Sequence, residues 1–270
     1  MSFETVSVTL ADGVAQVELN RPDKANAMNH QMWADIRSAF RVVDDMAEVR
    51  VAVISGSGNQ FSAGIDLAML AGLESELGNA CEGRSRERLR RKILDLQDAL
   101  TSIERCRKPV IAAIHGACIG AGVDLITCCD MRYATVDTYF QVKEIDVGMA
   151  ADVGTLQRMP KLVPDGIVRE LVYTGRRFDA EEARQMGLVN RVYGSVDEMR
   201  NGVAQTAASI AHKSPLAIRG SKEMLVYSRD HSVAEGLNYV ATWNAAMLLS
   251  ADLTEAMTAA KERRPARFGE

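Results

Sequence analysis

Three acidic residues stand where the surrounding sequence is small and apolar. Asp124 follows a glycine-rich loop, while Glu144 and Asp152 fall in the segment 141–154, which is rich in Val, Ile, Met, Ala and Gly. Acids in such surroundings either cap helices and form salt bridges or have shifted pKa values, and acids of the second kind are the usual acid and base catalysts. The pattern leaves both interpretations open for each of the three. We assign the neighbouring Asp146 to the first kind, an acid that caps a helix or forms a salt bridge.

A catalytic site with acidic groups also needs groups that stabilise negative charge, and two loops of small residues can supply them. Residues 61–66 and 115–124 each follow a short apolar run, at 51–54 and 110–114, and each opens a predicted helix. A helix N-terminus presents unpaired N–H groups with a partial positive charge. Two such loops that converge would form an oxyanion hole. A pair of ordinary tight turns is the alternative.

Other kinds of site have little support in the sequence. The glycines at 120 and 122 lack the third glycine of a dinucleotide-binding fingerprint, because position 125 is Leu. The four histidines are scattered without metal-ligand spacing, and His115, at the end of an apolar run, is predicted to be a core residue. None of the five cysteines forms a Cys-x-x-Cys pair. We therefore expect neither a metal site nor a disulfide framework.

The predicted elements that position these residues change along the chain. Strands alternate with helices in the first part, and only helices follow. A hairpin is predicted around Asp12-Gly13, and Asn29 is predicted to cap the next helix. The predicted strands are 6–10, 14–19, 51–54, 110–114, 131–134 and 139–142, with a long amphipathic helix at 84–107. The later predicted helices are 180–187, 196–212, 215–229, 232–248 and 252–262. This order predicts an α/β core over 1–195 and a C-terminal helical region over 196–270.

The composition is that of an ordinary globular protein. The 270 residues carry a net charge of −4, with 25% charged and 47% hydrophobic residues, so no global attraction to nucleic acid or to an anionic membrane is expected. His115 and Asp124 interrupt the apolar stretch 109–129, which favours a buried strand and helix over a membrane span. Neither the N-terminus nor the segment 267–270 resembles a targeting signal, so a cytoplasmic protein is expected.

Motifs in a fixed order resemble those of the crotonase superfamily (enoyl-CoA hydratases and isomerases) along nearly the whole chain. They are Arg21-Pro22, Asn26-Ala27-Met28-Asn29, Phe61-Ser62-Ala63-Gly64-Ile65-Asp66 and the segment 108–116. Within the superfamily, the segments 118–125 and 140–158 are similar to those of Δ3,5-Δ2,4-dienoyl-CoA isomerases. Those isomerases share the acids Asp124, Glu144 and Asp152, whereas the hydratases typically have Glu in place of the first and Gly in place of the last.

The resemblance implies both a fold and an activity. The fold is α/β, a crotonase-like spiral of strand–strand–helix units with a C-terminal helical region that assembles homotrimers or homohexamers. The activity is that of an isomerase that moves a double bond in an acyl-CoA, from 3,5-dienoyl-CoA to 2,4-dienoyl-CoA, in the β-oxidation of unsaturated fatty acids. Proton transfer by two carboxylates through a stabilised dienolate requires no metal and no redox cofactor. Coenzyme A is part of the substrate and is therefore not counted as a cofactor.

The same resemblance implies roles for individual residues. The N–H groups of Ala63 and Ala121 hold the thioester oxygen, although the family usually has glycine at the second position. Asp152 removes the C2 proton, Glu144 delivers a proton at C6, and Asp124 lies between them as an orienting group. The expected substrate-binding residues are Lys24, Ala25, Ala27, Ser62, Ala63, Gly64, Ile65, Asp66 and Ala121.

Two other functions remain open at this point. One is an enoyl-CoA hydratase or a Δ3-Δ2-enoyl-CoA isomerase on the same scaffold, although Asp152 would crowd a site that adds water. The other is a non-catalytic homologue that binds acyl-CoA or RNA. Its only support is the basic segment 84–92, which is predicted to be a solvated helix face. An inert binding protein would not need three buried acids.

Overall fold

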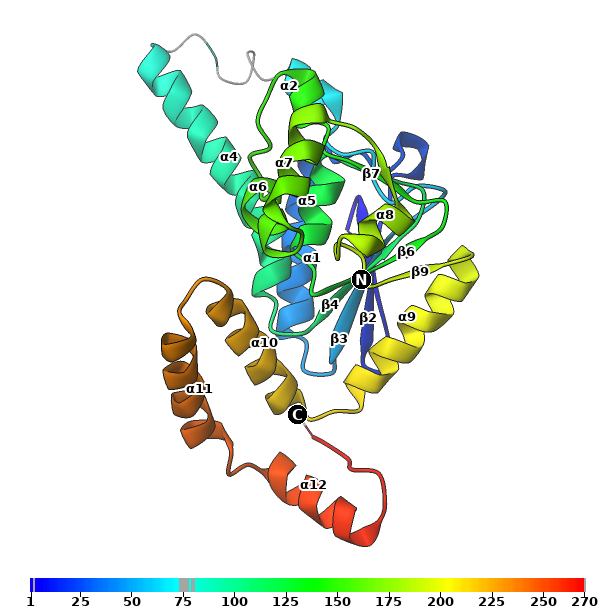
Figure 1. The fold of residues 1–270 in the computed structure, drawn as a ribbon, viewed down its shortest axis with the longest axis vertical. Coiled ribbons are helices and arrows are strands. Elements are labelled where there is room, and N and C mark those ends of the chain that lie inside the picture. The colour runs from blue at the N-terminus through cyan, green and yellow to red at the C-terminus, as the bar shows by residue number, and fades with distance from the viewer. Residues whose placement is uncertain (2, 73–77, 79–80, 270) are drawn as a thin grey trace.

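Two β-sheets with helices packed against them make up most of the chain, and a run of helices extends from one end (Figure 1). The computed structural model describes residues 1, 3–72, 78 and 81–269. Glu270, the last residue of the predicted C-terminal region, lies outside the described residues.

The larger sheet contains most of the predicted strands, in the order β1-β2-β3-β4-β6-β9. Their bounds are β1 Val6–Ala11, β2 Val14–Leu19, β3 Val51–Gly56, β4 Val110–Ile114, β6 Met131–Thr135 and β9 Arg191–Tyr193. The first pair is antiparallel and the remaining pairs are parallel. Asp12 and Gly13 both have positive φ, 49° and 77°, as two-residue hairpin turns require, so the predicted hairpin is confirmed.

The smaller sheet consists of β5 Ala117–Ile119, β7 Tyr139–Gln141 and β8 Phe178–Asp179. Successive strands alternate between the sheets, because β4 and β6 join the larger one while β5 and β7 join the smaller one. This alternation produces the spiral of strand–strand–helix units, and the expected fold class is confirmed. The sequence did not predict β5, β8 and β9, since two or three residues are too short to show an alternating pattern.

The predicted helices are present within a few residues of their expected ends. The described helices are α1 His30–Asp45, α2 Leu67–Ala71, α4 Glu82–Arg105, α5 Ala121–Thr127, α6 Thr155–Arg158, α7 Asp165–Thr174, α8 Ala180–Gln185, α9 Val196–Ala211, α10 Pro215–Arg229, α11 Val233–Met247 and α12 Ala251–Glu262. Asn29 caps α1 by accepting from the Met32 amide at 3.0 Å, and Ser232 with Glu235 forms a capping box at α11.

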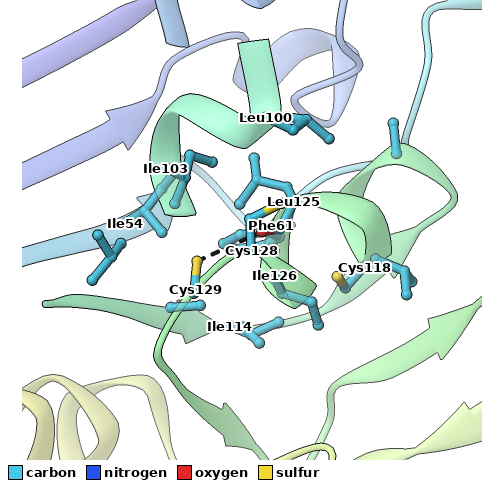
Figure 2. Close-up of a cluster of buried hydrophobic side chains, with 14 of the residues drawn as sticks. Ile54, Phe61, Leu100, Ile103, Ile114, Cys118, Leu125, Ile126, Cys128 and Cys129 are labelled. Carbon is cyan, nitrogen blue, oxygen red and sulfur yellow. Dashed lines mark hydrogen bonds between the residues drawn. The ribbon is translucent and has the colours of Figure 1, made fainter. Parts of the chain in front are cut away.

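Helices cover both faces of the larger sheet. On one face, α1, α4 and α5 enclose the main apolar core, part of which Figure 2 shows around Phe61, Ile103 and Leu125. On the opposite face, α9 packs Val203 against the alternate side chains of β3 and β4, such as Val53. The helix α9 therefore belongs with the sheet, while α10 to α12 extend beyond it (Figure 1).

The basic segment 84–92 lies on the first half of α4, and most of its side chains are exposed. Ion pairs of 2.9 Å join Glu82 to Arg86 and Glu87 to Arg91 along the helix. This arrangement agrees with the predicted solvated face. Among the described residues, no helix combines the length and the apolar character needed to cross a bilayer.

The core beneath α4 should dominate the stability of the fold. We expect Ile103→Ala to lower the free energy of unfolding by about 2–5 kcal/mol, because a fully buried side chain leaves a cavity. Leu94→Ala on the same helix should change it by less than about 0.5 kcal/mol, since Leu94 is 43% exposed. Urea unfolding of the two variants measures the difference, and equal losses would contradict this account of the core.

Candidate active site

The three predicted acids line one cavity of about 240 Å³. Asp124, Glu144 and Asp152 share its wall with both small-residue loops, represented by residues 63–65 and 119–121. Much of the remaining lining is apolar and includes Trp33, Leu67, Leu96, Val147, Met149 and Val153. A mostly apolar pocket with a few converging polar groups is the usual form of a site for a small molecule.

Asp124 lies in the first turn of α5 and is fully buried. Its Oδ1 accepts a hydrogen bond of 2.5 Å from the Thr155 amide, while its Oδ2 has no hydrogen-bond partner among the described residues. Burial, followed by the negative charge of Glu144, raises the pKa of Asp124 to about 7. The carboxyl group is therefore able both to hold and to release a proton near neutral pH.

Glu144 and Asp152 have pKa values shifted in the same direction. Burial raises the pKa of Glu144, whose Oε2 is buried without a partner among the described residues. Its Oε1 packs over Gly120, at 3.1 Å from the point where a Cβ on that glycine would lie. Burial also raises the pKa of Asp152, which is partly buried. Such neighbouring acids do not all ionise readily, which suits them to exchange protons with a bound molecule.

The two loops converge as the sequence predicts. The Ser62 amide donates to the Ala117 carbonyl at 2.9 Å, and the Ile119 amide donates to the Ser62 carbonyl at 3.0 Å. Gly64 has φ +90°, and a Cβ there would lie 2.7 Å from the Ile119 carbonyl oxygen. Only glycine allows both this backbone conformation and this close approach.

The predicted oxyanion pair Ala63 and Ala121 requires one correction. The Ala63 amide donates to the Ala25 carbonyl at 2.8 Å and is not available to a ligand. The Ile65 and Ala121 amides make no hydrogen bond within the described chain, and both residues line the cavity. Among the described residues, Ile65 and Ala121 therefore carry cavity-lining amides that are free to bind a ligand oxygen.

The reason for this correction is a local pairing of two loops. Met28 donates to the Gly64 carbonyl at 2.7 Å and accepts from the Asp66 amide at 3.0 Å. In this parallel bridge the Gly64 carbonyl and the Asp66 amide, on either side of Ile65, form the hydrogen bonds to Met28. The amide of Ile65 itself is therefore not used in the pairing. Sequence analysis could have found it only by recognising residues 63–66 as extended backbone that pairs with Met28.

The expected substrate-binding residues divide into three groups. Ala63, Gly64, Ile65 and Ala121 line the cavity. Ser62 and Asp66 instead fasten the loops together, since the Ser62 hydroxyl donates to the Asn26 carbonyl at 2.9 Å and the Asp66 carboxylate accepts from Arg21 at 3.0 Å. Lys24, Ala25 and Ala27 lie on the adjoining loop outside the cavity, with Lys24 exposed to solvent.

Two residues that the sequence predicts to be structural make structural contacts. His115 is buried, and its Nε2 lies 3.0 Å from the Gly58 carbonyl oxygen. Asp146 forms a 2.6 Å ion pair with Lys143. In the part of the chain that the structure describes, no group of three or more His, Cys, Asp or Glu side chains is arranged to hold a metal ion.

Comparison with known proteins identifies the family of this chain. The sequence profile of the enoyl-CoA hydratase/isomerase family matches residues 9–270. The chain belongs to this family. Among its relatives, the peroxisomal Δ(3,5)-Δ(2,4)-dienoyl-CoA isomerase of Arabidopsis thaliana is 47% identical, over 99% of this chain and 96% of its own. The mitochondrial enzyme of the same name from Homo sapiens is 48% identical, over 97% of this chain and 81% of its own.

More distant members of the family share the fold. A crotonyl-CoA hydratase of Syntrophomonas wolfei is 33% identical, over 99% of both chains. The crystal structure of an enoyl-CoA hydratase from Bacillus anthracis superimposes with a TM-score of 0.90 at 29% identity, covering 99% of this chain and all of the other.

The names of the relatives overturn the expected cytoplasmic location. The Arabidopsis relative is peroxisomal, and the mouse and human relatives are mitochondrial. The expectation was wrong because it rested on composition and on the absence of a recognisable signal, and neither encodes an organelle.

The raised pKa of Asp124 has a consequence for stability. Between about pH 4 and pH 7 the folded protein keeps a proton on Asp124 that the unfolded chain has lost, so this group makes folding less favourable as pH rises. An asparagine at this position cannot ionise, and its side-chain oxygen can still accept from the Thr155 amide. We expect the stability of Asp124→Asn relative to the native protein to increase by about 1–3 kcal/mol from pH 5 to pH 8. Urea unfolding at each pH measures it, and a constant difference would contradict the assigned shift.

Proposed function

We propose that this protein is a Δ3,5-Δ2,4-dienoyl-CoA isomerase that converts 3,5-dienoyl-CoA to 2,4-dienoyl-CoA in the β-oxidation of unsaturated fatty acids. The observation that carries the proposal is the convergence of three acids with raised pKa values and two unpaired amides on one cavity. Relatives at 46–48% identity bear this name and cover nearly the whole chain.

The amides of Ile65 and Ala121 bind the thioester oxygen. A proton on C2 of a thioester is too weakly acidic to be removed unless the enolate charge is stabilised. Two preorganised N–H donors provide that stabilisation, and a single donor of this kind typically contributes about 10²–10³-fold to the rate. In a 3,5-dienoyl thioester the charge spreads along the conjugated chain to C6.

Glu144 is placed to take the C2 proton. Its carboxylate packs over Gly120, the residue that precedes the Ala121 amide, and C2 is the carbon next to the thioester carbonyl. Asp152 then delivers a proton to C6 at the far end of the dienolate. This division of labour reverses the one that the resemblance implies for Glu144 and Asp152, and the position of Glu144 next to Gly120 supports it.

Asp124 completes the cycle by returning the proton. After one turnover Glu144 carries the proton taken from C2, and Asp152 has lost the proton given to C6. Asp124 interacts electrostatically with both, its Oδ2 is free of partners among the described residues, and its pKa of about 7 allows it to pass a proton on. The electrons move only within the substrate, so the step requires no redox cofactor, and the two amides provide the charge stabilisation for which a metal ion would otherwise be needed.

Coenzyme A lies along the loops 24–28 and 62–66, with the adenine near Lys24. The paired backbone of these loops supports this placement, because it leads from the protein surface to the Ile65 amide.

The protein assembles as a homotrimer or homohexamer through its C-terminal helices. Large apolar side chains exposed there support this assembly, and they include Leu225, Val233, Leu237, Leu249 and Met257.

An ultraviolet assay tests the function directly. Purified protein mixed with a 3,5-dienoyl-CoA should produce the longer-wavelength absorbance of a conjugated 2,4-dienoyl thioester. A parallel reaction with a 2-enoyl-CoA should show little hydration, because Asp152 occupies space that added water would need. Hydration without isomerisation would indicate a hydratase, and the absence of a reaction with either substrate would refute the proposed activity.

Deuterium labelling distinguishes the roles of the two terminal acids. In D₂O, Asp152→Asn should form no product but should still exchange the C2 proton of the substrate, because Glu144 and the oxyanion hole remain. Glu144→Gln should lose both exchange and product formation, each by at least about 10²-fold. Mass spectrometry of the recovered substrate measures the exchange. The opposite pattern would show that Asp152, and not Glu144, removes the C2 proton.

A further inference from the structure

A second cavity, polar and of about 420 Å³, adjoins the active site. Its lining includes Gln97, Thr101, Glu104, Arg158 and Arg229. Val153 lines both cavities, so the turn 152–155 forms a wall that the two share.

This turn sets the position of two of the three acids. Asp152 is its first residue, and the carbonyl of Asp152 accepts a 2.6 Å hydrogen bond from the Gln97 side chain. Thr155 is its last residue, and its amide holds the Asp124 carboxylate at 2.5 Å. Gly154 between them has φ 141°, a conformation that other residues rarely adopt. A shift of the turn would therefore displace Asp152 and loosen Asp124 together.

Arg158 braces the turn from behind. Its guanidinium lies against Gly154 so closely that any side chain at that position would collide with it. Glu104 on α4 binds this guanidinium through two contacts of 3.2 Å, to Nε and Nη2, and Thr101 accepts from Nη2 at 3.1 Å. The side chains of Arg158 and Glu104 are each only 13% exposed, so the pair is largely shielded from solvent.

Arg229, the last residue of α10, forms a second ion pair with Glu104. Burial alone would raise the pKa of Glu104, but the hydrogen bonds from Arg229 and Arg158 outweigh it and lower that pKa. The carboxylate is therefore charged at neutral pH. A buried ion pair contributes little net stability, because the loss of hydration offsets the attraction, but it fixes the geometry of the groups that it joins.

We propose that Glu104 is a positioning residue for the isomerisation: through Arg158, it holds the turn 152–155 where Asp152 can protonate C6. This inference rests on the proposed function. It also connects the C-terminal helices to the active site, because Arg229 of α10 shares the same carboxylate.

The test compares Glu104→Gln with Glu104→Asp and with a control on the same helix. Asp98→Asn is the control, because Asp98 pairs with Arg37 at 3.5 Å and with Arg105 and has no contact with the turn. We expect Glu104→Gln to lower kcat by about 10–100-fold while KM stays within about threefold, since small displacements of a catalytic group act on the transition state. Glu104→Asp should recover part of kcat, and Asp98→Asn should leave it unchanged.

Exchange at C2 in D₂O separates positioning from general damage. Glu104→Gln should still exchange the C2 proton, because Glu144 is not attached to the turn. Loss of thermal stability with an unchanged kcat would show that Glu104 is only structural and would overturn the inference, as would loss of C2 exchange together with a large change in KM. If Glu104→Gln does not fold, an unchanged kcat in Glu104→Asp overturns it. A native enzyme that does not turn over 3,5-dienoyl-CoA refutes the proposed function itself, before any variant is compared.

Discussion

The rest of the structure depends on one unfavourable arrangement, the placement of three carboxyl groups in a single, largely apolar cavity. Burial in a poorly hydrated space raises the pKa of all three acids, and repulsion from a neighbouring carboxylate adds to the shift for Asp124 and Glu144. The fold must hold these groups together against that repulsion. It does so with contacts to main-chain atoms, such as the Thr155 amide on Asp124 and the Gln97 side chain on the Asp152 carbonyl, which leave the outer carboxylate oxygens free for chemistry.

The alternation of strands between two sheets explains why the acids and the amides meet. The chain leaves the larger sheet after β3 and β4 and passes through the loops at 62–65 and 117–121, which pair with each other through Ser62 and Cys118. The strand β7, which pairs with β5, then leads directly into Glu144. Electrophilic and acidic groups that are far apart in the sequence are therefore assembled by backbone pairing, before any substrate binds.

The sequence was sufficient for the parts of the molecule that local patterns determine. Asn29 and the apolar spacing behind it predicted α1, and the apolar context of Asp124, Glu144 and Asp152 predicted buried acids. It was insufficient where long-range pairing decides the outcome. The use of the Ala63 amide by Ala25 is invisible in a run of small residues, and β8 is only two residues long. The packing of α9 on the sheet likewise depends on a partner surface that the helix sequence does not reveal.

The amides of Ile65 and Ala121, which we propose as the oxyanion donors, belong to the main chain, and this affects how the protein tolerates substitution. Substitution at Ile65 or Ala121 alters a side chain but not the N–H group, provided that the backbone conformation survives. Alanine scanning, which reports only on side chains, would therefore miss the donor at Ile65 and would not sample Ala121, which is already alanine. The groups most directly involved in charge stabilisation would be silent in such a scan, while Gly64, which contributes no hydrogen bond to the substrate but has φ +90°, would register as intolerant. Mutational sensitivity in this family thus reports on backbone geometry before it reports on chemistry.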